Sequence, residues 1–126
     1  MAQTDLRLSK IGVIMLGAAD LARSVAFYRD KLGLSVKQEI PGFGFLDGGG
    51  VMLCLSQPLA RATGRGPGAT EIVFSVEDVR AAHEALRAKG VAFTQEPRVV
   101  SGPMWAATFE DPAGHGLSVF GPERKP

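Results

Sequence analysis

The most informative stretch of this chain is residues 14–36, which read IMLGAADLARSVAFYRDKLGLSV. It holds a short apolar run, an aspartate, a segment with helical periodicity that ends in Arg-x-Lys, a glycine and a second apolar run. Residues 72–93, IVFSVEDVRAAHEALRAKGVAF, repeat this order of elements, so that Asp20 matches Asp78. An internal repeat of this kind predicts a fold built from two similar modules.

Each module contains one predicted helix. The first covers residues 21–32, where Asp20 can accept hydrogen bonds from the first turn and Gly33 can end the helix in a left-handed conformation. The second covers residues 79–89. The apolar stripes that should face a sheet are Leu21, Val25, Tyr28 and Leu32 in the first helix and Val79, Ala82 and Leu86 in the second.

Short runs of β-branched and aromatic residues between turn residues predict the strands. They cover residues 11–17, 35–40, 43–46 and 51–55 in the first module (about 8–57), and residues 71–76, 91–95, 104–110 and 116–120 in the second (about 69–121). Each module therefore has the order β-α-β-β-β, which makes the fold α+β. We expect residues 57–68 to form a mobile connection, and the 126 residues to form one domain, because neither module could bury its sheet alone.

The composition limits the partners and the compartment. Lys and Arg number 14 and Asp and Glu number 13, so the net charge of +1 provides no basic surface for nucleic acid. The single cysteine cannot form an intrachain disulfide, and neither a signal-peptide pattern nor a run of about 18 apolar residues is present. We therefore expect a cytoplasmic protein that binds neither nucleic acid nor membranes.

Two motifs carry a resemblance to a known family. Residues 20–34, DLARSVAFYRDKLGL, resemble the signature DLxxSxxFYxxxLGL of the vicinal oxygen chelate superfamily, and residues 109–117, FEDPAGHGL, are similar to its C-terminal signature, which begins DPxG. The superfamily includes glyoxalase I, extradiol dioxygenases, fosfomycin-resistance enzymes and drug-binding bleomycin-resistance proteins. The resemblance covers about residues 8–121. It implies that the two modules form a half-open cleft of mixed sheets, in a homodimer whose cleft lies within one chain or across two.

The resemblance also implies where a metal would lie. In the metal-dependent members, four inward positions on the first and last strands of the modules hold His, Glu or Gln ligands. These positions correspond to Val13, Cys54, Glu71 and Ser118 here. Valine cannot ligate and serine is a poor ligand, which leaves two donors where such sites use three or four. We therefore expect no metal and no cofactor.

Strand alternation predicts the wall of the cleft, because successive side chains point to opposite faces of a sheet. The larger apolar sets, such as Ile72 and Phe74, should lie beneath the helices. The second face should then present Val13, Met15, Met52, Cys54, Glu71, Val73 and Ser118. A mostly apolar wall with one acid is typical of small-molecule pockets.

Aromatic residues near the cleft mouth could stack on an aromatic ligand. Phe43, Phe45 and Trp105 are the candidates. The face of Trp105 is left open, because it shares its strand parity with Ala107 and Phe109, which could belong to the core.

Glu71 could have either a functional role or none. It could be a general base or a carboxylate that anchors a ligand, or it could be a solvated residue at the start of a strand. Cys54 has no predicted histidine beside it, so we expect a buried filler rather than a nucleophile. We expect His83 and His115 to be surface residues. Arg61 and Arg65 in the connection could reach an anionic ligand or remain in a solvated loop.

Two functional classes follow from these observations. The first is a glyoxalase/bleomycin-resistance-like protein that binds a small apolar or aromatic molecule in a metal-free cleft. The alternative is an enzyme of the same superfamily, a lyase, isomerase or dioxygenase, that uses Glu71 as a base or holds a divalent metal at an atypical site. Replacing Glu71 with Gln should separate them, because binding by shape would survive and proton transfer would not.

Overall fold

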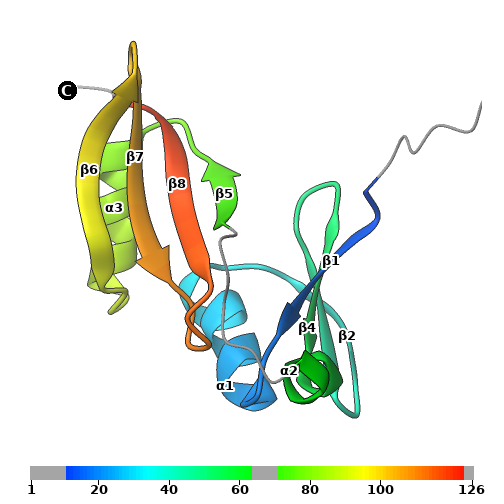
Figure 1. Cartoon of the computed structure of the whole chain (residues 1–126). Helices are drawn as coiled ribbons and strands as arrows, with labels where there is room; N and C mark the ends of the chain where they lie inside the picture. The colour runs from blue at the N-terminus through cyan, green and yellow to red at the C-terminus, as the bar shows by residue number, and fades with distance from the viewer. Residues whose placement is uncertain (1–10, 64–70, 124–126) are drawn as a thin grey trace, which may run out of the picture.

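The computed structural model describes residues 11–63 and 71–123 and shows two four-stranded mixed sheets accompanied by a few helices (Figure 1). Along the chain the elements are β1 (Val13–Gly17), α1 (Leu21–Ala26), the π-helical turn η1 (Phe27–Lys31), β2 (Val36–Ile40), β3 (Phe43–Asp47), β4 (Met52–Ser56), α2 (Gln57–Thr63), β5 (Glu71–Ser75), α3 (Val79–Ala88), β6 (Phe93–Ser101), β7 (Met104–Glu110) and β8 (Gly116–Pro122).

The two sheets have the same topology. Their strand orders are β1-β4-β3-β2 and β5-β8-β7-β6, and in each sheet the first strand runs parallel to the last while the other pairs are antiparallel. The predicted α+β fold with two β-α-β-β-β modules is therefore confirmed. No helix in the described parts of the chain is long and apolar enough to cross a membrane.

The first helical segment differs from the single predicted helix over residues 21–32. It begins as predicted, with the Asp20 carboxylate accepting a hydrogen bond from the Arg23 N–H at 3.2 Å. Its last turn, η1, is π-helical, and the Leu32 N–H donates to the Phe27 carbonyl at 3.2 Å. The wider turn buries Phe27 and Tyr28 together, with their rings edge to face at 5.6 Å.

The prediction of a mobile connection over residues 57–68 was wrong for its first part, because residues 57–63 form α2. The Ser56 hydroxyl accepts a hydrogen bond from the Leu59 N–H at 3.0 Å, which is the geometry of a serine N-cap. The helix packs on Gly17, where a Cβ would lie 3.1 Å from the Ala60 Cα. Arg61 is exposed, and Arg65 lies outside the described residues.

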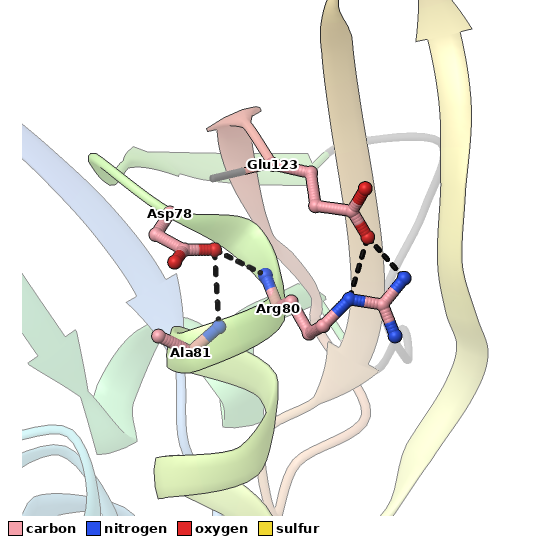
Figure 2. Close-up of polar contacts among 4 residues, drawn as sticks. All are labelled: Asp78, Arg80, Ala81 and Glu123. Atoms are coloured by element: carbon pink, nitrogen blue, oxygen red, sulfur yellow. Dashed lines mark hydrogen bonds and ion pairs between the residues drawn. The ribbon is translucent and has the colours of Figure 1, made fainter. Parts of the chain in front are cut away.

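The helix of the second module is held at its start by polar contacts of Asp78 and Arg80 (Figure 2). The Asp78 carboxylate accepts hydrogen bonds from the Arg80 and Ala81 N–H groups at 3.1 and 3.2 Å. The Arg80 side chain pairs with Glu123, which follows β8, and so ties the first turn of α3 to the end of the sheet. Beyond this helix, β6 extends to Ser101, well past the predicted limit at residue 95.

The core joins residues of both modules in one cluster. Its buried members are Leu16, Ala18, Val25, Phe27, Tyr28, Leu46, Leu53 and Leu55 from the first module and Val79, Val91, Ala107, Phe109, Leu117 and Val119 from the second. The Tyr28 hydroxyl donates a hydrogen bond to the buried Asp111 carboxylate at 2.8 Å. Burial is the main reason that the pKa of Tyr28 is raised above its usual range, and the charge and hydrogen bond of Asp111 raise it further.

The histidines are not the surface residues that the sequence predicted. His83 is buried, with its ring against Phe93 at 4.5 Å and its Nε2 3.1 Å from a Glu96 carboxylate oxygen. His115 is half-buried, and its Nε2 lies 2.8 Å from the Gly17 carbonyl oxygen of the other module. Neither position follows from local periodicity, because each depends on a neighbour distant in the sequence.

Candidate functional site

The first candidate surface is the face of the β1-β4-β3-β2 sheet that points away from the core, called face A here. By register it includes Val13, Met15, Phe43, Phe45, Met52 and Cys54, with Gly17 and Ser56 at one end and Asp47 at the other. Alternate residues such as Ile14 and Leu53 pack into the core instead, as the alternation predicted. The side chains of Val13 and Met15 are 48% and 47% exposed, so face A presents apolar surface to solvent.

Cys54 lies at the centre of face A, between Met15 on β1 and Phe45 on β3. It is fully buried, and its thiol has only a long contact of 3.9 Å to the Leu55 carbonyl. Burial raises the pKa of the Cys54 thiol, which lowers its thiolate fraction at neutral pH. The environment is that of an apolar filler rather than of a nucleophile.

The second candidate surface is the corresponding face of the β5-β8-β7-β6 sheet, called face B. Glu71, Val73 and Ser118 lie on it, with Val73 directly opposite Ser118 in the register and Thr108 on the other side of Ser118. Val73 is 50% exposed and Ser118 is 3% exposed. Glu71 is exposed at the start of β5, and within the described residues it makes no ion pair.

Trp105 lies on the opposite face of this second sheet, which resolves the open question of its parity. It packs against the hydrophobic core beside α3, and the Arg80 guanidinium lies over its ring at 5.8 Å. The pairing of Arg80 with Glu123 holds that cation in place (Figure 2). Trp105 is therefore not brought together with the other predicted site residues.

Faces A and B do not meet at Glu71 within one chain. Glu71 and Val73 line a hollow of about 250 Å³ between the modules. The residues of the first module that line this hollow all lie outside face A: Ile14, Leu34, Gly48, Val51 and Leu53. The predicted site residues thus fall into two half-sites, one on each sheet.

The donor set at the family's metal positions does not fit a metal centre. Val13 offers no ligand atom, and Ser118 would have to lose its proton to bind a divalent ion firmly. Cys54 and Glu71 remain, on different sheets. Within the described residues there is no group of three or more His, Cys, Asp or Glu side chains that could hold a metal ion.

Comparisons with known proteins agree with this architecture. Residues 10–119 match the model of the Glyoxalase/Bleomycin resistance protein/Dioxygenase superfamily. The chain belongs to this superfamily. The resemblance of the two sequence motifs to the vicinal oxygen chelate signatures is thereby confirmed.

The chain is also similar in fold to solved structures whose names indicate different roles. A glyoxalase/bleomycin resistance protein/dioxygenase from Nocardioides is 27% identical, with a TM-score of 0.79 over 98% of this chain and 89% of that one. A lactoylglutathione lyase from Agrobacterium tumefaciens is 24% identical, with a TM-score of 0.74 over 90% and 93%. The antibiotic binding protein TnmS3 from Streptomyces sp. CB03234 is 21% identical, with a TM-score of 0.77 over 94% and 100%. The last two show the fold alone.

One charged residue of face B was missed by the sequence reasoning. Arg98 lies on β6, paired with Ala106, and its guanidinium reaches the Thr108 hydroxyl on face B. The predicted strand ends at residue 95 and therefore assigns Arg98 to no sheet face. Its position after Pro97, before Val99 and Val100, was the available signal, because a β-branched pair extends a strand.

Proposed function

We propose that this protein binds a small apolar or aromatic molecule in a metal-free cleft formed by face A of one protomer and face B of its partner. The observation that carries the proposal is the exposure of Val13, Met15 and Val73, each close to half, on the two sheet faces that point away from the core. Monomeric proteins rarely leave large contiguous apolar surface in water, and such surface marks ligand or protein contacts.

A homodimer, which belongs to the same proposal, would bring the two faces together. Each chain carries two different half-sites that point away from its own core, so a twofold partner could place face A against face B twice. The bound molecule would then contact Met15, Phe45 and Met52 from one protomer and Val73 and Ser118 from the other. Cytoplasmic location, suggested by the single buried Cys54, belongs to the same proposal.

A neutral aromatic probe tests the proposal. N-phenyl-1-naphthylamine, whose fluorescence rises in apolar surroundings, should bind the wild-type protein and should bind Met15→Glu at least tenfold more weakly, because a buried carboxylate costs more than a methionine contact. Val99→Glu is the matched control, since Val99 is 57% exposed but outside both faces. Equal binding by wild type and Met15→Glu would refute the proposed cleft.

The variant Glu71→Gln tests whether binding depends on the carboxylate of Glu71. The amide keeps the size of the side chain and loses its capacity to accept a proton, so binding of the neutral probe should stay within about twofold of wild type. A large loss of neutral-probe binding would place Glu71 at the centre of recognition and would count against binding by shape.

A further inference from the structure

Arg98 is held over face B without a carboxylate partner. Its Nη1 donates to the Ala106 carbonyl at 3.3 Å and its Nη2 donates to the Thr108 hydroxyl at 3.4 Å, both of which are long hydrogen bonds. Across residues 11–63 and 71–123, no ion pair involves Arg98. A guanidinium has five N–H donors, so most of this group's hydrogen-bonding capacity is unused.

Two hydroxyl-bearing residues, Thr108 and Ser118, lie next to Arg98 on successive strands of face B. Thr108 is directly opposite Ser118, and Ser118 is directly opposite Val73 on β5. Ser118 is 3% exposed, and its hydroxyl makes no hydrogen bond to any described residue. The hydroxyl is not among the buried polar atoms that lack a partner, so it is accessible to solvent and can donate to a ligand oxygen at this point.

The charges on face B are separated along the strands. Glu71 and Glu110 both pair with Gly116, at one end of the sheet, whereas Arg98 pairs with Ala106. Ala106 is four residues from Glu110 on β7, which corresponds to about 13 Å. An anionic group is therefore repelled at the Glu71 end and attracted at the Arg98 end. An anionic ligand on face B should bind with its charged group toward Arg98.

We propose that Arg98, with the hydroxyls of Thr108 and Ser118, is the anchor for an anionic group, and that the molecule bound in the cleft is an aromatic or apolar carboxylate. The inference rests on the proposed function, because the apolar body of the ligand occupies the cleft between face A and face B. A guanidinium matches a carboxylate in shape and can bind both of its oxygens at once.

A pair of probes that differ only in charge tests the anchor. Binding of 2-naphthoate and 2-naphthamide is measured by calorimetry for the wild type, Arg98→Gln and the matched control Arg87→Gln, which removes the same charge from an exposed position on α3. The wild type should prefer the carboxylate by about tenfold, as expected for one charge-assisted hydrogen-bonding group at a solvent-accessible site. Arg98→Gln should abolish that preference and leave naphthamide binding unchanged.

The outcomes distinguish the anchor from the cleft. Equal binding of both probes by the wild type, or a preference for the carboxylate that persists in Arg98→Gln, overturns the anchor and leaves the apolar cleft standing. Failure of both probes to bind the wild type overturns the anchor together with the cleft. If Arg87→Gln also loses the preference for naphthoate over naphthamide, the preference comes from the net charge of the protein, and the anchor is overturned. Weakening of naphthoate binding alone as salt is raised supports it.

Discussion

The hydrogen bond between Tyr28 and Asp111 joins the two modules. The phenol comes from the π-helical turn η1 of the first module, and the carboxylate precedes the last strand of the second. Asp111 also accepts hydrogen bonds from the Ala113 and His115 N–H groups, at 2.9 and 2.8 Å. The carboxylate therefore shapes the turn before β8 and binds the helix at the same time.

The chain has a single tyrosine, so absorbance at the phenolate band reports Tyr28 alone. The raised pKa means that the folded protein keeps the proton after the unfolded chain has released it, so stability should fall as pH rises past about 10. We expect the native protein to show no phenolate signal at a pH where the urea-unfolded protein shows it fully. Native titration at the same pH as the unfolded chain would contradict the buried hydrogen bond.

At the scale of elements, the helix of the second module depends on its cap. Asp78 satisfies two N–H groups that have no partner inside the helix (Figure 2). The same first turn carries Arg80, which covers Trp105 and pairs with Glu123. Fraying of the turn would thus release a side chain that shields the core as well as two hydrogen bonds.

Asp78→Ala should lower the free energy of unfolding by about 1 kcal/mol, within the usual range for loss of a helix cap. Urea unfolding measures the effect, and Asp78→Ser is the control, because a serine hydroxyl can still accept from the same N–H groups. If both variants lose equal stability, the carboxylate acts through its charge or through another contact rather than as a cap.

The sequence predicted the elements where local chemistry is sufficient. Asp20 and Asp78 marked the helix starts, and alternating residues such as Ile72 and Val73 marked the faces. It failed where the relevant partner is remote or weakly signalled. The cap of α2 is the single hydroxyl of Ser56 before a proline-containing segment, and the length of β6 depends on its bulged pairing with β7.

At the scale of the whole molecule, the sheet faces of the candidate residues could be predicted but the grouping of those residues could not. Parity placed Met15, Cys54 and Val73 on the correct sheet faces. Whether the two faces meet depends on how the modules pack, and that packing rests on contacts such as Tyr28 with Asp111 that no local pattern encodes. Trp105 remained ambiguous for a similar reason, because α3 determines which face is covered.

Mixing two defective variants tests whether the cleft is shared between chains. Met15→Glu damages face A and Val73→Glu damages face B, so neither homodimer should bind N-phenyl-1-naphthylamine. A heterodimer would contain one cleft with both changes and one with neither. Random assortment after co-refolding should therefore restore about a quarter of the wild-type binding capacity. If the cleft lies within one chain, mixing should restore nothing, and the size of the assembly in solution gives an independent check.

Strand pairing in the described chain occurs only within each module, so side chains rather than a common ladder join the two sheets. The hydrogen bond between Tyr28 and Asp111 closes a loop of 83 residues. The entropic cost of closing a flexible loop grows slowly, by about 0.6 kcal/mol for each doubling of its length. A longer spacer between the modules should therefore cost little chain entropy, and we expect insertions there to be tolerated better than insertions within either sheet.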